Sequence, residues 1–130
     1  MTNGNQVVFE AKFSLWFTAI AELLLANNAD ANARSKRGDT PLHWAAANGH
    51  KLVAQLLLAH KADINAADQG GWTPMHMAAR TGRKDMLELL LAKKADINPK
   101  DKDGVTPLGR ATAQGHRVVV EFLRQRGGRS

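Results

Sequence analysis

The stretch Gly38-Asp39-Thr40-Pro41-Leu42-His43 decides how this chain folds, because its pattern returns twice at a fixed interval. The two later copies, each 33 residues after the one before, are Gly71-Trp72-Thr73-Pro74-Met75-His76 and Gly104-Val105-Thr106-Pro107-Leu108-Gly109. The surrounding residues keep this register, and residues 34–66 and 67–99 are identical at about half of their positions. A fixed period of this size indicates stacked repeats, in which each unit buries its apolar face against the next.

Each unit carries the signals for two short helices. Thr40 is a good N-cap, because its hydroxyl can accept a hydrogen bond from an early helix amide, and Pro41 suits the first helical position. Gly49 is expected to end this helix with a positive φ. A second helix is predicted over residues 51–59. Its apolar spacing predicts that three side chains are buried, namely Val53, Leu56 and Leu57.

These residues resemble the ankyrin repeat. The resemblance rests on Thr-Pro-Leu-His-x-Ala-Ala, then Gly-His, Leu-Leu-Leu and Ala-Asp-Ile-Asn, and it covers residues 34–126 clearly and 19–33 in part. It implies an all-α solenoid of stacked antiparallel helix pairs joined by hairpin-like loops. It also implies structural roles for the repeated histidines, since His43 and His76 would hydrogen-bond within and between repeats.

The expected organisation is a single ankyrin-repeat domain spanning residues 1–130. Residues 34–66 and 67–99 are full repeats, residues 1–33 a degenerate N-terminal cap, and residues 100–130 a C-terminal capping repeat with a short tail. In the last repeat, polar residues replace packing residues, as expected of a terminal unit that faces water. The positions concerned are Gly109, Arg110, Thr112 and Arg124.

The first repeat departs most from the pattern, because Trp16 and Phe17 stand where the Gly-His turn should be. Two outcomes follow. In one, the aromatic residues cover the open end of the stack as a modified cap, and the protein is a monomer. In the other, the two helices fuse into one long helix, and residues 9–17 support a homodimer or a domain-swapped assembly. We favour the cap. The aromatic residues concerned are Phe9, Phe13, Trp16 and Phe17.

Composition sets further bounds. The chain has no cysteine, which excludes a disulfide framework and thiolate chemistry, and its formal net charge is +6. The apolar run over residues 13–21 is flanked by Glu10 and Glu22, so it does not resemble a signal peptide. No stretch is apolar for long enough to span a bilayer. We therefore expect an intracellular, most simply cytoplasmic, protein without membrane contact.

The sequence shows no catalytic constellation, no cofactor motif and no metal site, so we expect no enzyme activity. No serine or threonine has the context of a nucleophile, and the glycine pairs lack the lysine of a phosphate loop. Carboxylates are scattered rather than paired. His43 and His76 lie one repeat apart, which is too far for the two rings to share a zinc ion.

The ankyrin resemblance places partner contacts at the loop tips and at the ends of the first helices. These positions vary between repeats while the scaffold does not, as a binding surface would. We therefore expect a non-catalytic protein–protein interaction module with a concave binding surface. The candidate residues are Lys36, Arg37, Asp39, Ala47 and Asn48, then Gln69, Gly70, Trp72, Arg80 and Thr81, and then Lys102, Asp103, Val105, Ala113 and Gln114.

Trp72 is the most informative of these residues, because tryptophan and arginine dominate binding hot spots and Arg80 is close to it in the pattern. The alternative is that the ring lies over its own loop or over a neighbouring lysine or arginine. Trp44 is expected to be core packing. A second functional hypothesis is electrostatic binding of nucleic acid or another polyanion through Lys36, Arg37, Lys102 and the C-terminal arginines. It is the weaker one, because no nucleic-acid motif is present.

Overall fold

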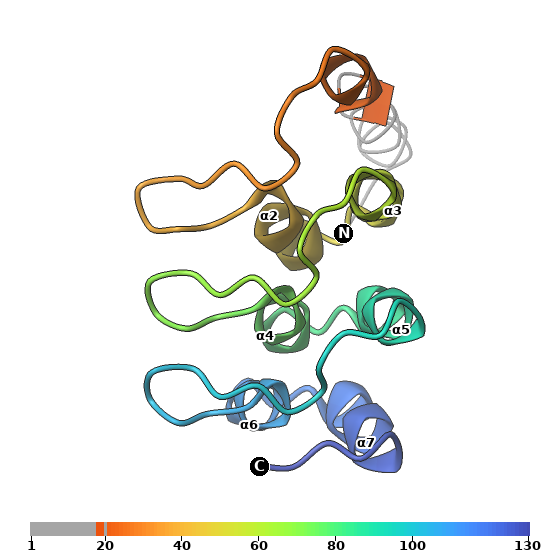
Figure 1. Ribbon diagram of the computed structural model, residues 1–130. Helices are drawn as coiled ribbons and strands as arrows, with labels where there is room; N and C mark the ends of the chain where they lie inside the picture. The colour runs from red at the N-terminus through yellow and green to blue at the C-terminus, as the bar shows by residue number, and fades with distance from the viewer. Residues whose placement is uncertain (1–17, 20) are drawn as a thin grey trace, which may run out of the picture.

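Three hairpin loops project from the same side of a two-row stack of helices (Figure 1). The fold is seen in a computed structural model that describes residues 18, 19 and 21–130. The inner row, next to the loops, consists of α2 (Pro41–Asn48), α4 (Pro74–Arg80) and α6 (Pro107–Ala113). The outer row consists of α3 (Lys51–Ala59), α5 (Lys84–Ala92) and α7 (Arg117–Gln125). Residues 18, 19 and 21–26 are also helical and lie before α2. The protein is thus an all-α repeat solenoid, as predicted.

The inner helices begin as the sequence predicts. The Thr40 hydroxyl accepts a hydrogen bond from the His43 amide, and Nδ1 of the same histidine accepts from the Thr40 amide at 3.0 Å. Thr73 and His76 repeat this reciprocal cap in α4. Two otherwise unpaired donors are satisfied in each case, which fixes where the helix starts and how its histidine is oriented.

Glycine closes the turn between the two helices of each repeat. The φ angles of Gly49 and Gly82 are 71° and 73°, so the predicted left-handed turn is confirmed at both positions. A Cβ at Gly82 would also lie 2.9 Å from Nδ1 of His116, which belongs to the next repeat. This glycine is therefore required both by its own backbone and by the close approach of its neighbour.

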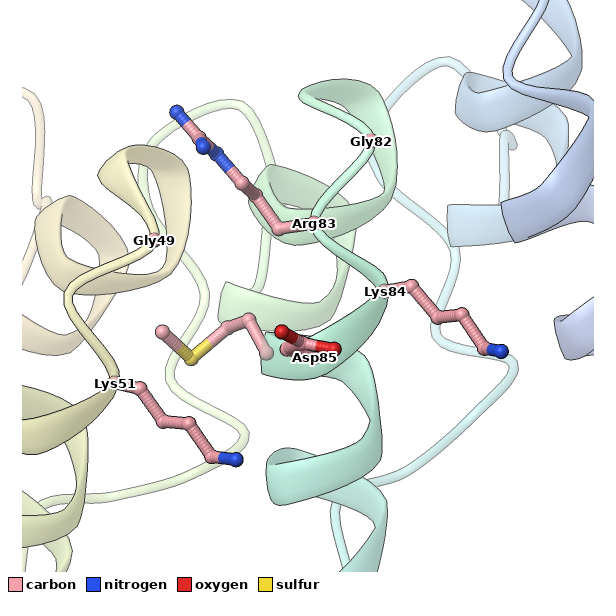
Figure 2. A pocket seen from close by; sticks show the side chains of 7 residues that line it. Gly49, Lys51, Gly82, Arg83, Lys84 and Asp85 are labelled. Atoms are coloured by element: carbon pink, nitrogen blue, oxygen red, sulfur yellow. The ribbon is translucent and has the colours of Figure 1, made fainter.

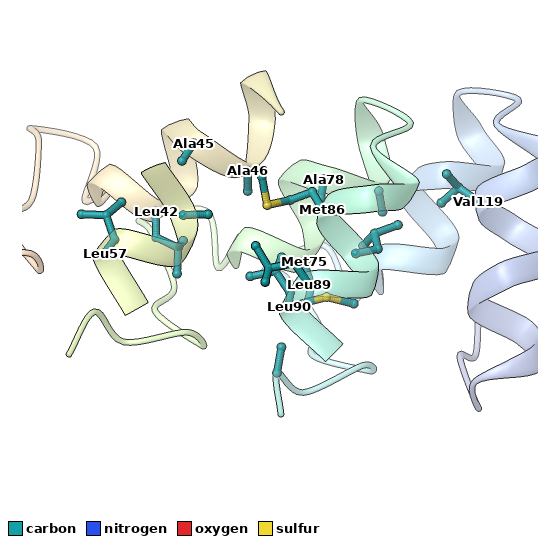
Figure 3. Close-up of a cluster of buried hydrophobic side chains, with 14 of the residues drawn as sticks. Leu42, Ala45, Ala46, Leu57, Met75, Ala78, Met86, Leu89, Leu90 and Val119 are labelled. Carbon is teal, nitrogen blue, oxygen red and sulfur yellow. The ribbon is translucent and has the colours of Figure 1, made fainter. Parts of the chain in front are cut away.

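Apolar side chains of both rows form one continuous core along the stack (Figure 3). Leu42 and Met75 hold corresponding positions in α2 and α4 and are fully buried. Alanines of the inner helices are also fully buried, which lets successive helices approach closely; they are Ala45, Ala46, Ala78, Ala79 and Ala111. In α3 the burial of Val53 and Leu57 is confirmed, whereas Leu56 is only partly buried.

The hairpin loops are braced against one another by backbone and side-chain hydrogen bonds. The Gln69 amide donates to the Arg37 carbonyl at 2.8 Å, and the Lys102 amide donates to the Gly70 carbonyl at 2.9 Å. Histidines add a second set of links. Nε2 of His43 lies 2.7 Å from the Trp72 carbonyl, and Nε2 of His76 lies 2.8 Å from the Val105 carbonyl. The loops are therefore a preorganised surface rather than independent segments.

Two predictions about packing are wrong. Trp44 is not core, since it is 43% exposed and its ring stacks on His50 with the ring centres 4.9 Å apart. Trp44 lines a depression together with Ala47 and Met77. Arg110 does not simply face water, since it is half-buried and forms an ion pair with Asp101.

The predictions for Phe9, Phe13, Trp16 and Phe17 fall outside the described residues. What the structure shows at that end is an apolar surface. Leu23 and Leu24 are more than half exposed, and a depression of about 260 Å³ lies beside them. Its apolar lining includes Leu24, Leu25, Trp44, Val53 and Leu57.

Candidate binding surface

The side of the stack that carries the hairpin loops, which the ankyrin resemblance predicts to be concave, has a depression of about 270 Å³ between the first two described hairpin loops and α4. A smaller one of about 190 Å³ adjoins it, and the two share Asp39 and Met77. The larger depression is lined by Arg37, Asp39, Asp68, Gln69, Gly70, Trp72, Met77 and Arg80. Six of the candidate residues proposed from the sequence thus lie together: Arg37, Asp39, Gln69, Gly70, Trp72 and Arg80.

Trp72 is half-buried rather than an exposed anchor, which corrects the simplest expectation. The Arg110 guanidinium lies 4.6 Å from the centre of its ring, and the Arg80 guanidinium lies 5.6 Å from it. The His76 ring is tilted against it, with the ring centres 5.6 Å apart. The alternative weighed for this residue, a ring packed against a neighbouring arginine, is therefore the one observed. Trp72 nevertheless lines the depression.

Arg110 is held in place by two carboxylates. Its Nε donates to Oδ2 of Asp101 at 2.8 Å, and a terminal nitrogen lies 3.0 Å from Oδ2 of Asp103. Burial by itself would raise the pKa of Asp101. The amide of Val105, the Arg110 guanidinium and the amide of Asp103 outweigh burial, so the pKa lies below its usual range. Asp101 is thus a buried, fully ionised partner for Arg110 at neutral pH.

A pair of carboxylates that sequence reasoning missed lines the depression itself. Oxygens of Asp39 and Asp68 and a ring nitrogen of His43 all lie within 4.8 Å of one another. Burial, and then the Asp68 carboxyl, raise the pKa of Asp39 above its usual range, and His43 and Arg37 offset only part of this. The expectation that carboxylates are not paired is therefore wrong. They come from neighbouring repeats, so the sequence spacing within a repeat could not reveal them.

The trio of Asp39, His43 and Asp68 is a poor ligand set for a metal ion. Nδ1 of His43 accepts the Thr40 amide hydrogen, so Nε2 carries the ring proton and donates it to the Trp72 carbonyl. Neither nitrogen then has a lone pair available for a metal. Oδ1 of Asp68 is likewise used, because it accepts from the amides of Gly70 and Trp72.

Most of the remaining candidate residues are exposed, and several serve the scaffold. Gln69 donates its side-chain amide to the Lys36 carbonyl, Asn48 to the Trp44 carbonyl, and the Thr81 hydroxyl to the Met77 carbonyl. Asp103 is engaged with Arg110. The exposed members are Lys36, Arg37, Asn48, Gln69, Gly70, Arg80, Thr81, Lys102, Asp103, Ala113 and Gln114. The half-buried members are Asp39, Ala47, Trp72 and Val105.

A further depression of about 340 Å³ lies at the turns that join the two helices of a repeat (Figure 2). Its lining does not form a cluster of reactive or charged side chains. Lys51, Arg83 and Lys84 line it, yet Figure 2 shows the Lys84 side chain pointing away from the other two. The Lys84 ammonium lies 3.8 Å from Glu88 instead. The basic side chains therefore do not converge on one point.

Comparison with known families agrees with the geometry. A family model described as ankyrin repeats, in three copies, matches residues 17–101 and 68–129. The chain is an ankyrin-repeat protein. None of the curated proteins compared with it matches. Ankyrin repeats are generally protein–protein interaction modules and typically non-catalytic scaffolds. Among the described residues of this ankyrin-repeat protein, each helix is too short or too polar to cross a membrane.

Proposed function

We propose that this ankyrin-repeat protein is a non-catalytic interaction module that binds a partner protein on its concave surface, around Trp72 and Arg80. The observation that carries the proposal is the depression in which these two residues lie together with Met77. Half-buried tryptophan beside arginine is the composition of a binding hot spot. The ring is held by its neighbours before a partner arrives, which lowers the entropy cost of binding.

The rigid loops support the same proposal. Hydrogen bonds between successive loops and from the two buried histidines fix the backbone that carries the variable side chains. The scaffold residues recur at the repeat period, whereas the residues that line the depression differ from one repeat to the next. Asp39, Trp72 and Val105, for example, hold one position in three successive loops. A partner would thus recognise one layer of the stack and not another.

Capture from native lysate tests the proposal. The wild-type protein, Trp72→Ala and Arg80→Ala serve as baits, and Leu52→Ala and Arg124→Ala are the matched controls. Leu52 and Arg124 are exposed on α3 and α7, in the other row of helices. We expect one protein to be retained by the wild type and both controls and lost with both concave variants. Equal capture by all five baits would contradict the proposal.

Polyanion binding is the second candidate, and the exposure of Lys36, Arg37 and Lys102 on the hairpin loops favours it. Counterion release makes such binding strongly salt-dependent, with log K falling linearly with log salt. A single-stranded oligonucleotide titrated at several salt concentrations tests it. A dissociation constant that does not change with salt, or no binding at low salt, excludes this candidate. Dimerisation through residues 9–17 concerns residues outside the described part and stays a prediction.

A further inference from the structure

The repeats allow one layer of the concave surface to be compared directly with the next. Asp68 and Asp101 are equivalent, and each accepts hydrogen bonds from two amides of its own loop. Two other positions differ between the layers. The upper layer contains Asp39, Asp68 and Met77. The lower layer contains Trp72, Asp101 and Arg110 at the corresponding positions of the next repeat.

The lower layer contains its own cation. The Arg110 guanidinium is bonded to Asp101, which has a fully buried side chain, and it covers the face of the Trp72 ring. A carboxylate that the loop holds in this way therefore accepts a guanidinium from the concave side. The protein itself shows the geometry, because Arg110 reaches Asp101 from the first helix of the same repeat.

The upper layer has the carboxylates without the cation. Met77 stands in place of Arg110, so Asp68 lacks the ion pair that Asp101 forms. Asp39 brings a second carboxylate to the same place, and its buried Oδ1 atom has no hydrogen-bond partner. Arg37 and Arg80 line the depression, but neither forms an ion pair with these carboxylates. Two carboxylates thus lie close together, and Arg37 compensates their charge only in part.

We propose that the partner inserts an arginine side chain between Asp39 and Asp68, in the way that Arg110 lies against Asp101. The inference rests on the proposed function and names the chemistry that the concave surface recognises. Arginine suits the site better than lysine, because its planar guanidinium donates to two carboxylates at once. The adjoining depression, with Trp44, Ala47 and Met77, offers an apolar wall for the residue next to that arginine.

The probe for this site is N-acetyl-arginine methylamide, compared with its citrulline counterpart, which has the same shape without the charge. Binding is followed by the backbone amide signals of Gln69 and Gly70 and the indole signal of Trp72. We expect the arginine probe to shift all three signals and the citrulline probe to leave them in place. Equal shifts with both probes, or none with either, overturn the inference.

Variants locate the probe. Asp39→Asn and Asp68→Asn remove the two charges, and the second keeps the Oδ1 atom that the loop amides require. Each is expected to weaken the arginine probe at least about tenfold, as for the loss of a hydrogen bond to a charged group. Asp85→Asn, which removes an exposed carboxylate on α5, is the matched control and should leave the affinity within about twofold. Unchanged affinity in both concave variants contradicts the inference.

The captured partner separates this inference from the function on which it rests. A partner that is lost with Trp72→Ala but retained by Asp39→Asn and Asp68→Asn overturns the arginine site and leaves the concave interface standing. A protein that binds the arginine probe at Asp39 and Asp68 but captures no partner overturns the proposed function and leaves the site standing. Loss of the partner with all three variants supports both.

Discussion

The guanidinium of Arg110 lies 4.6 Å from the centre of the Trp72 ring and joins two successive repeats. Arg110 belongs to α6, and Trp72 lies in the hairpin loop before α4, one repeat earlier. The same guanidinium is bonded to Asp101, so one side chain neutralises a buried charge and supports a half-buried ring. The stability of the C-terminal repeat and the orientation of the binding residue are therefore linked.

Replacing Arg110 with methionine, the residue at the equivalent position of α4, tests this link. The change leaves the Asp101 carboxylate buried without its cation, and we expect the free energy of unfolding to fall by about 2–4 kcal/mol. Urea unfolding followed by circular dichroism measures it. Arg124→Met, at an exposed position of α7, is the control and should change stability by less than about 0.5 kcal/mol. A similar small loss in both variants means that the ion pair contributes nothing.

Replacing Trp72 with alanine is expected to cost about 1–2 kcal/mol of stability, because the ring is half-buried and lies against two guanidinium groups. The backbone carbonyl that accepts from His43 is kept in the variant, so the loop should remain in place. Denaturant unfolding gives the stability change, and a loss above about 4 kcal/mol would mean that this residue is mainly structural.

Asp39→Asn is expected to raise stability at neutral pH by about 0.5–1 kcal/mol, by removing one of two neighbouring negative charges. A carboxyl whose pKa is raised in the folded state favours folding at low pH, and this contribution is lost as the pH rises through the raised pKa. The variant should therefore match the wild type below the ordinary pKa of about 3.8 and exceed it well above that value. Thermal unfolding across the pH range measures the difference, and a pH-independent difference contradicts the pairing.

Two glycines with nearly equal φ angles separate backbone strain from crowding. Gly82 has a φ of 73° and Gly115 one of 72°, but only at Gly82 would a Cβ meet a neighbouring side chain within 4 Å. Gly115→Ala is expected to cost about 1 kcal/mol from strain alone. Gly82→Ala should cost at least about 1 kcal/mol more, and Gly82→Val more again. Equal losses for the two alanine variants mean that His116 moves away freely.

The fold could be predicted because its determinants are local and repeated. The Thr-Pro cap, the glycine turn and the apolar spacing lie within one repeat, and each acts on neighbours a few residues away. The surface could be predicted only in part, because its contacts join different repeats. Asp39 meets Asp68 across 29 residues, and Arg110 meets Trp72 across 38, so no spacing within one repeat shows either contact.

The two errors in the packing predictions concern contacts within one repeat. Trp44 and Arg110 hold one position of the repeat, and the sequence assigned packing to the first and solvent to the second. In the structure the position lies on the concave edge of the inner helix, where its role depends on the loops beside it. Trp44 stacks on His50, whereas Arg110 finds a carboxylate. Both partners lie in the same repeat as the residue but outside the helix that carries it, so the apolar pattern of that helix does not reveal them.

Binding of the partner at Trp72 is tested by the dissociation constant of the captured partner for Trp72→Ala, measured by calorimetry below the unfolding transition. We expect Trp72→Ala to lose about 2 kcal/mol or more of binding free energy, roughly thirtyfold in affinity, and Leu52→Ala to bind as the wild type does. An unchanged affinity for Trp72→Ala, in a variant shown to be folded, would contradict the claim that the partner binds on the concave surface at this residue.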